Sequence, residues 1–101
     1  MGKEVYRCKQ LPKTGMVYIP IKWCREFGLE SGDQVDIYHD GTDIFIEKAS
    51  EASLHNKRYI SAANSVNIPV EIRNYAGITS KQDYCLYVDE TNERFIISLV
   101  E

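Results

Sequence analysis

Residues 15–38 read GMVYIPIKWCREFGLESGDQVDIY, and this stretch predicts a strand, a short helix and a second strand. Pro20 suits the first helical position, where the missing backbone N–H costs nothing, and Gly28 suits the position after a helix, where a left-handed backbone is favoured. Trp23 and Phe27 are four residues apart, so they share one apolar face of this helix. The apolar residues on either side predict the two strands, Met16 to Ile19 and Gln34 to Tyr38.

A second copy of this pattern, NSVNIPVEIRNYAGITSKQDYCL, occupies residues 64–86. Pro69 and Gly77 stand 49 positions after Pro20 and Gly28, and the apolar residues between them stay in phase. An Ile-Pro and a glycine at one fixed spacing indicate an internal repeat of about fifty residues. The repeats that we expect are residues 1–50 and 51–101, which together form one intertwined domain.

Alternation and turn residues predict the remaining strands. Residues 5–11 alternate loosely, and the sequence His39-Asp40-Gly41-Thr42 between alternating apolar residues indicates a hairpin. Residues 49–56 are polar and small, which favours a linker. The second copy is expected to form strands at 57–62, 66–68, 84–88 and 94–100 and a helix at 70–76. Because four short strands leave a whole sheet face wet, the two repeats are expected to interleave in one mainly β barrel with pseudo-twofold symmetry.

Composition places the chain among globular proteins. It has 101 residues, of which 44% are hydrophobic and 27% charged. It has no apolar run that could span a bilayer, and its N-terminus is too polar for a signal peptide, so a cytoplasmic location is expected. The three cysteines lack a CxxC spacing. We therefore expect reduced thiols, at least two of them buried, and neither a disulfide framework nor a zinc ribbon.

The charge distribution is more informative than the net charge of −3. Residues 3–25 carry six Lys or Arg against one Glu, whereas residues 26–50 carry one Lys against seven acids. Residues 57–73 repeat the basic character more weakly, with three cations against Glu71. Each repeat thus has a basic front and an acidic back, and the two fronts would form one basic face if they converge in space.

The segment KTGMVYIPIKWCREFGLESGDQVDIYHDGTDIFIEK at 13–48 resembles the AbrB/MazE/SpoVT family of DNA-binding domains. The segment ISAANSVNIPVEIRNYAGITSKQDYCLYV at 60–88 is similar to the MazE branch, through its Asn-Ser before a strand that ends in Ile-Pro. The resemblance implies a swapped-hairpin β-barrel, normally built by two identical chains, that grips DNA through its basic first strands and the loops after them. Two copies in one chain imply an intrachain pseudo-dimer with one short helix per repeat.

The chain departs from the family pattern at several positions. Met16 and Ser65 stand where family members commonly carry an arginine. A helix arginine of the family is Cys24 in the first copy and is kept as Arg73 in the second. The second copy also has Lys81-Gln82 in place of Gly-Asp, which puts a side chain where positive φ is expected. These departures predict attenuated contact with DNA.

The candidate DNA contacts are cations and amides on the first strands, on the loops after them and on the first helical turns. They are Arg7, Lys9, Gln10, Lys13, Lys22, Arg25, Lys57, Arg58, Asn64 and Arg73. A merely solvated charged face is the alternative explanation of the same residues. Trp23 and Phe27 are expected in the core, because Ile72 and Ala76 at the corresponding positions cannot stack on bases.

No pattern in the sequence points to catalysis. The cysteines, His39 and His55 lack the spacing of metal ligands or of a Cys-His nucleophilic site, and the acids of the first repeat do not match an EF-hand loop. We therefore expect no enzymatic activity, no metal, no cofactor and no small-molecule substrate.

The sequence thus predicts a prokaryotic, sequence-selective DNA-binding regulator of transcription, with double-stranded DNA as its partner and a homodimer as a further association. The alternative is a protein-interaction module, antitoxin-like or an adaptor, that kept the barrel and lost DNA binding. Antitoxin activity is the weaker version, because MazE-type proteins bind their toxin through a tail, and here the sequence ends at Glu101, directly after the last expected strand. Neither partner involves a membrane.

Overall fold

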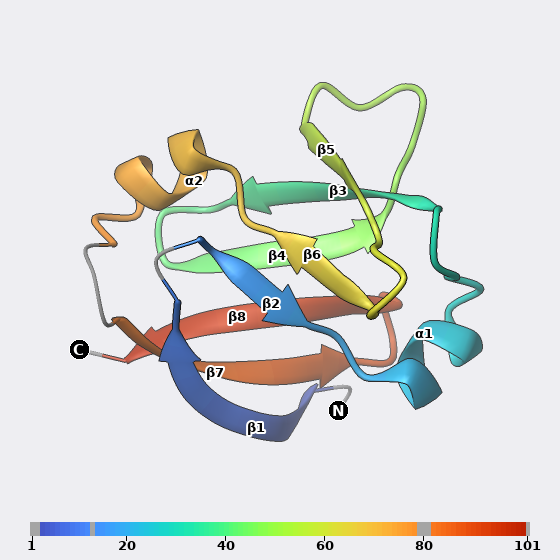
Figure 1. Cartoon of the computed structure of the whole chain (residues 1–101), viewed down its shortest axis with the longest axis horizontal. Coiled ribbons are helices and arrows are strands. Elements are labelled where there is room, and N and C mark those ends of the chain that lie inside the picture. The colour runs from blue at the N-terminus through green and yellow to red at the C-terminus, as the bar shows by residue number, and fades with distance from the viewer. Residues whose placement is uncertain (1–2, 13, 79–81, 101) are drawn as a thin grey trace.

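The computed structural model describes residues 3–12, 14–78 and 82–100, and in it the chain is mainly β, as predicted. The described part forms eight strands and two short helices (Figure 1). In chain order they are β1 (Lys3–Leu11), β2 (Met16–Tyr18), α1 (Ile21–Glu26), β3 (Gln34–His39), β4 (Asp43–Lys48), β5 (Asn56–Tyr59), β6 (Ser65–Asn67), α2 (Val70–Tyr75), β7 (Gln82–Asp89) and β8 (Arg94–Val100).

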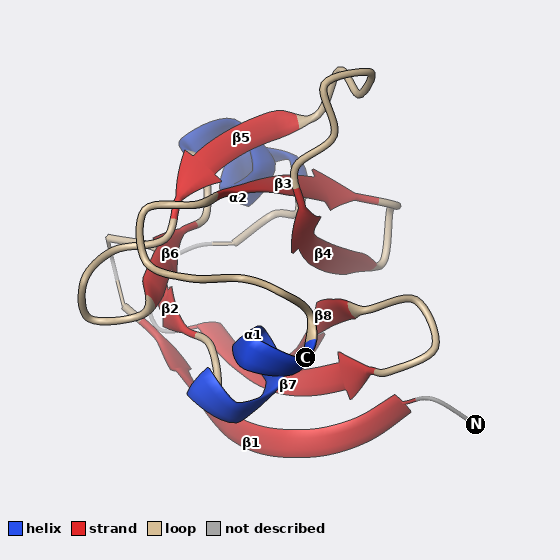
Figure 2. Cartoon of the chain, turned by 90° about the vertical axis from the view of Figure 1, so that its right-hand side faces the viewer, coloured by secondary structure: helices blue, strands red, loops and turns tan. Residues whose placement is uncertain are grey.

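The strands form one six-stranded sheet in the order β1-β7-β8-β4-β3-β5 and one two-stranded ribbon, β2-β6. All pairings are antiparallel. Each end strand of the large sheet pairs with a strand from the other half of the chain, β1 with β7 and β5 with β3. The sheet is strongly curved, and the ribbon lies across its open side (Figure 2).

The ribbon is centred on two residues that lie 49 positions apart in the sequence. Val17 is opposite Val66 at its centre. Beyond its two ends, the N–H of Ile19 donates to the carbonyl of Asn64 at 3.0 Å, and the N–H of Ile68 donates to the carbonyl of Gly15 at 2.8 Å. Gly15 and Asn64 have φ values of 75° and 62°, so each turn enters the ribbon through a residue in the left-handed conformation.

The core lies between the inner face of the sheet, the ribbon and α1. Its fully buried members are aliphatic residues of these elements and of the loops next to them, together with Phe95. The ring of Phe27 lies 5.4 Å from the ring of Phe95 and 5.9 Å from that of Trp23. Phe27 is buried and Trp23 packs against the core from its edge, so both belong to the core as expected.

Both helices begin after the Ile-Pro and end before the glycine that predicted them. Gly28 and Gly77 have φ values of 72° and 73°, the left-handed conformation expected just after a helix. The main difference from the predicted boundaries concerns the second copy, where β5 begins at Asn56, inside the expected linker, and ends at Tyr59 rather than at residue 62. The expectation for Lys81 falls outside the described residues.

The prediction of three reduced thiols, at least two of them buried, is wrong. Cys8 and Cys85 form a disulfide with an S–S distance of 2.04 Å, and in the described part of the chain only Cys24 is free and buried. The bond joins β1 to β7, where Cys8 lies directly opposite Cys85. The two cysteines are 77 positions apart, so no local spacing could indicate the pairing, and only the register of the strands brings them together.

Candidate nucleic-acid interface

The predicted contacts that the structure brings together surround a surface groove beside α1. The groove has a volume of about 540 Å³ and is lined by Arg7 of β1, Tyr18 of β2, Lys22 of α1 and Asn64 of the turn before β6, among other residues. A second hollow of about 470 Å³ adjoins it, shares Asn64, and adds Arg25. We call this pair of hollows the α1 groove.

Helix α1 supplies two of the cations of the α1 groove. Lys22 and Arg25 are three residues apart and both are exposed. The ammonium of Lys22 lies 5.1 Å from the centre of the Trp23 ring, a cation–π contact that holds the side chain across the helix surface. The mostly buried Trp23 therefore positions a cation beside the α1 groove.

Strand β1 presents its candidates on two different faces. Arg7 and Lys9 lie opposite Leu86 and Tyr84, whose side chains are buried, so the two cations share the face of β1 that turns toward the ribbon and α1. Gln10 lies opposite Asp83, on the face of β1 that also carries Cys8. The predicted base-reading amide of Gln10 thus points away from the α1 groove.

Asn64 holds the turn that borders the α1 groove. Its side-chain amide donates to the carbonyl of Ile19 at 2.6 Å and lies 3.5 Å from the sulfur of Cys24. Burial raises the pKa of the Cys24 thiol, and the hydrogen bond from Asn64 lowers it by less. Asn64 therefore fixes the distance between α1 and β6, a structural role that the sequence did not indicate.

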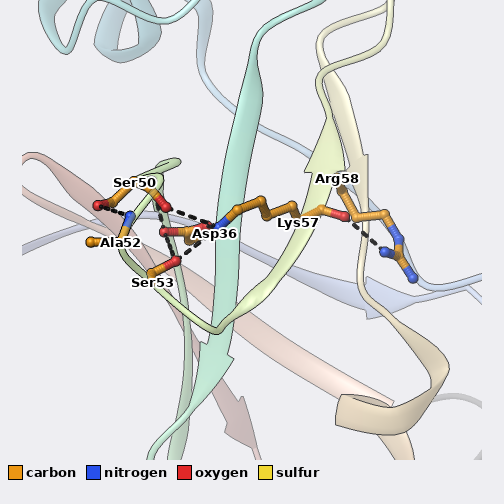
Figure 3. A network of polar contacts seen from close by, with 6 residues as sticks. All are labelled: Asp36, Ser50, Ala52, Ser53, Lys57 and Arg58. Atoms are coloured by element: carbon orange, nitrogen blue, oxygen red, sulfur yellow. Dashed lines mark hydrogen bonds and ion pairs between the residues drawn. The ribbon is translucent and has the colours of Figure 1, made fainter.

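The ammonium of Lys57 is bonded to groups of the protein itself. Its ammonium lies 2.6 Å from a carboxylate oxygen of Asp36, 2.8 Å from the hydroxyl of Ser53 and 3.1 Å from the carbonyl of Ser50 (Figure 3). Burial opposes the ionisation of Asp36, but hydrogen bonds from Lys57, from Ser53 and from the N–H of Ser50 outweigh it and hold the pKa of Asp36 below its ordinary value. Lys57 therefore ties the loop before β5 to β3.

Two further arginines are also placed by backbone groups. Arg58 donates from its guanidinium to the carbonyl of Lys57 at 2.8 Å. Arg73 donates from Nε to the carbonyl of Ile68 at 3.0 Å and passes so close to Gly15 that a Cβ there would lie 2.7 Å from that nitrogen. Arg73 thus packs over the first turn and is not among the residues that line the α1 groove.

The predicted DNA contacts therefore fall into two groups, those at the α1 groove and those elsewhere on the surface. Arg7, Lys22, Arg25 and Asn64 meet around the α1 groove, and Lys9 follows Arg7 on the same face of β1. Gln10, Lys57, Arg58 and Arg73 lie elsewhere, and Lys13 is outside the described residues. Sequence reasoning missed Tyr18 and Ile21, which line the groove and are about half exposed at 50% and 54%. The sequence did indicate that Tyr18 is exposed, because Tyr18 alternates along the strand with Val17 and Ile19, which are buried.

Comparison with protein families agrees with the mainly β fold. Residues 9–53 match the family described as "Antidote-toxin recognition MazE, bacterial antitoxin". Through this segment, which is a little less than half of the chain, the protein is similar to the AbrB/MazE-like family. The solution structure of PHS018 from Pyrococcus horikoshii is similar with a TM-score of 0.49 and 20% identity, over 96% of this chain and 91% of that chain. Comparison with curated proteins gives no match.

The AbrB/MazE-like segment includes strand β1 from Lys9 onward, α1 and the hairpin of β3 and β4. It therefore contains Lys9, Lys22 and Arg25 of the candidate interface, whereas Arg7 and Asn64 lie outside it. Among the described residues, none of the helices has the length and apolar character needed to cross a membrane. No group of three or more His, Cys, Asp or Glu in that same part of the chain is arranged to hold a metal ion.

A second groove lies beside α2 and has a different character. Its volume is about 370 Å³, and its lining includes Asn56, Glu71 and Ile72, which stand 49 positions after Arg7, Lys22 and Trp23. The other lining residues include two histidines and two tyrosines, with His55 stacked on Tyr38 at 4.2 Å and His39 edge-on to Tyr75 at 5.2 Å. We call this the α2 groove. It carries the carboxylate of Glu71 at the position where the α1 groove carries Lys22.

Proposed function

We propose that this AbrB/MazE-like protein is a non-enzymatic, sequence-selective DNA-binding regulator of transcription that acts in the prokaryotic cytoplasm. The observation that carries the proposal is the convergence of Arg7, Lys22 and Arg25 around the α1 groove of a chain whose net charge is −3. An acidic chain that gathers cations on one face is suited to a polyanion, because phosphate contacts supply most of the affinity of DNA-binding proteins. Base edges then supply the selectivity.

We further propose that residues 1–50 and 51–101 are tandem copies of one unit that exchange their edge strands. The pairing of β1 with β7 and of β5 with β3 supports this proposal. Under it, the positions of Arg7, Lys22 and Arg25 correspond to Asn56, Glu71 and Asn74, which carry no positive charge. The first copy therefore provides most of the DNA contact, and the preferred site is asymmetric rather than a perfect palindrome.

The test is binding of the purified protein to labelled duplex DNA, including its own upstream region, over a series of salt concentrations. Three to four phosphate contacts give a slope of about −3 in a plot of log affinity against log salt. The double variant Arg7→Ala/Lys22→Ala is expected to reduce that slope by about 2, because two contacts are removed. Arg58→Ala is the matched control, since Arg58 is a cation on the opposite edge strand, and it is expected to leave the slope unchanged.

Two outcomes would contradict the proposal. Absence of binding near 50 mM salt, where phosphate contacts are strong, would mean that the cations of the α1 groove are only solvated surface charges. An equal loss of affinity in Arg58→Ala and in the double variant would mean that the α1 groove is not the contact surface.

The second candidate function is a protein-interaction module of the antitoxin or adaptor kind. The matched family is described by toxin recognition, and the α2 groove is flanked by Leu54 and Tyr75, which are 101% and 74% exposed. Exposed apolar side chains gathered at one groove are typical of protein contacts. Charge reversal at Lys22 and Arg25 separates the candidates, because it abolishes DNA binding and leaves a partner at the α2 groove in place. Light scattering of the purified chain tests the homodimer.

A further inference from the structure

Strand β1 is an end strand of the six-stranded sheet and pairs on one side with β7. Its pairing is irregular between Val5 and Arg7, and the next pair along the strand is Cys8 opposite Cys85. The disulfide therefore fixes the register of β1 directly beside a point where the ladder is interrupted. Its neighbours in the sequence, Arg7 and Lys9, are cations on the candidate DNA-contact face.

We propose that Cys8–Cys85 is a thiol–disulfide exchange site whose redox state controls DNA binding through the position of β1. In the oxidised protein the bond holds β1 in register, so Arg7 stays at the rim of the α1 groove and Lys9 on the same face. In the reduced protein β1 is held by its backbone ladder alone, and the cations lose their fixed placement. The inference rests on the proposed DNA-binding function and specifies its regulation.

The exchange proceeds with a dithiol as the reductant. One thiolate of the dithiol attacks the sulfur of Cys8, which is on an exposed residue, and the S–S bond breaks with the electron pair leaving on Cys85, which takes up a proton. The second thiol of the dithiol then loses its proton and attacks the mixed disulfide, which releases Cys8 as a thiolate that is protonated in turn. The protein gains two electrons and two protons, and the dithiol becomes a cyclic disulfide.

The other cysteine is separated from this site. Cys24 lies on α1, is 2% exposed and receives the contact from Asn64, so it is not accessible to a reductant or to a mixed disulfide. Burial also raises the pKa of the Cys24 thiol, which lowers the fraction present as the reactive thiolate. The exchange is therefore confined to the pair on β1 and β7.

The opposite edge of the sheet lacks this sensitivity. Lys57 and Asp36 stand 49 positions from Cys8 and Cys85 and are themselves directly opposite each other on β5 and β3. Their ion pair does not respond to thiols or oxidants. Because disulfides are rare in a reducing cytoplasm, the reduced form predominates there at rest, and formation of the bond reports an oxidising shift.

The experiment compares DNA affinity of the full chain after oxidation with oxidised glutathione and after reduction with dithiothreitol, with the thiol count measured by alkylation and mass spectrometry. Reduction is expected to weaken wild-type binding about tenfold, within the range of ordinary coupling between sites. The double variant Cys8→Ser/Cys85→Ser is expected to bind weakly in both conditions. Cys24→Ser, the matched control, is expected to respond to reduction as the wild type does.

Hydrogen exchange of the β1 amides gives a readout that does not depend on DNA. Faster exchange over residues 7–11 on reduction of the wild type supports the control of β1, even if neither form binds DNA, in which case the proposed function alone fails. Measurable DNA binding of equal affinity in the two redox forms, unchanged exchange of β1, or failure of the chain to form the Cys8–Cys85 bond under oxidised glutathione would each overturn the inference. Because the wild type itself is compared, the test stands even if the double variant does not fold.

Discussion

The two edges of the six-stranded sheet share one register and are held by different chemistry. On the β1 edge, Cys8 faces Cys85 and the pair is a covalent bond. On the β5 edge, the residues 49 positions away are Lys57 and Asp36, and the pair is an ion pair of 2.6 Å. The register of the edge strands is therefore independent of the kind of cross-link that it carries, which follows if turns and the alternation of buried residues set the register.

The ion pair needs more support from its surroundings than the disulfide does. Asp36 is only 1% exposed, so its charge is removed from water and must be compensated within the protein. The loop before β5 provides the hydroxyl of Ser53 and the N–H of Ser50, and Lys57 provides the charge. The disulfide instead acts on the unfolded chain, whose conformational freedom it restricts.

The largest expected effect comes from breaking the covalent edge. Reduction of the wild type should lower the free energy of unfolding by about 4 kcal/mol, because the Cys8–Cys85 bond closes a loop of roughly eighty residues in the unfolded chain. Urea unfolding of the oxidised and reduced forms measures it. The variant Cys8→Ser/Cys85→Ser should unfold identically with and without dithiothreitol. A reduced wild type as stable as the oxidised one would show that the bond adds nothing to this edge.

The ion-pair edge should be nearly as sensitive. Lys57→Met leaves the carboxylate of Asp36 buried without its counter-charge and should cost about 3 kcal/mol. The pairing itself is measured by a double-mutant cycle with Asp36→Asn, in which the second substitution should cost much less once the first is present. Strictly additive losses in urea unfolding would mean that Lys57 acts through packing alone.

The two edges should also differ in their response to acid. Because the folded-state pKa of Asp36 is below its unfolded value of 3.8, its contribution is fully present above that value and is lost as pH falls through the folded pKa. Unfolding measured between pH 6 and about pH 2 should therefore show a steeper acid loss in the wild type than in Asp36→Asn. The disulfide carries no titrating group, so its contribution should stay constant across this range. An identical pH profile in both proteins would contradict the assignment.

The α1 groove and the α2 groove also differ, in their charge, and this difference can be tested by giving the α2 groove the charges of the α1 groove. Asn56→Arg/Glu71→Lys places on the α2 groove the cations that Arg7 and Lys22 give to the α1 groove. If both copies face one duplex, DNA affinity should rise about fivefold and the salt slope should steepen by about 2. The isosteric control Glu71→Gln, which only removes the repulsive carboxylate, should give a smaller gain. An unchanged slope in the double variant would mean that the α2 groove faces away from DNA.

The sequence predicted those features that depend on neighbouring residues. Pro20 and Gly28, and their counterparts Pro69 and Gly77, located both helices, because a helix start and a left-handed stop are local requirements. Alternation located the strands, and the mainly β class followed.

The features that it missed all depend on which strands become neighbours. The Cys8–Cys85 bond joins residues from opposite ends of the chain. Lys57 looks the same in the sequence whether it is solvated or paired with Asp36, and only the β5–β3 register decides. Gln10 lies on the other face of β1 from Arg7 and Lys9, and the sequence could not show this because strand phase relative to a partner strand is not encoded in a loosely alternating stretch.

The smallest effect is expected where the two halves are most alike, at the turns that enter the ribbon. Asn64 has a φ of 62°, so Asn64→Gly relieves a left-handed conformation that costs an ordinary residue about 1 kcal/mol. The same change removes the hydrogen bond to the carbonyl of Ile19, which contributes about 1 kcal/mol. The two effects oppose each other, and the urea midpoint should move little.

The reciprocal change, Gly15→Asn, should not be tolerated in the same way. Its Cβ would lie 2.7 Å from Nε of Arg73, which is held by the carbonyl of Ile68, so the side chain would have to break that bond to move. A loss of about 1 to 2 kcal/mol is expected in the same urea assay. Equal effects of the two substitutions would mean that Arg73 moves aside freely. The predicted inequality arises because one turn is covered by an arginine and the other supplies its own amide, although both residues have the same backbone conformation.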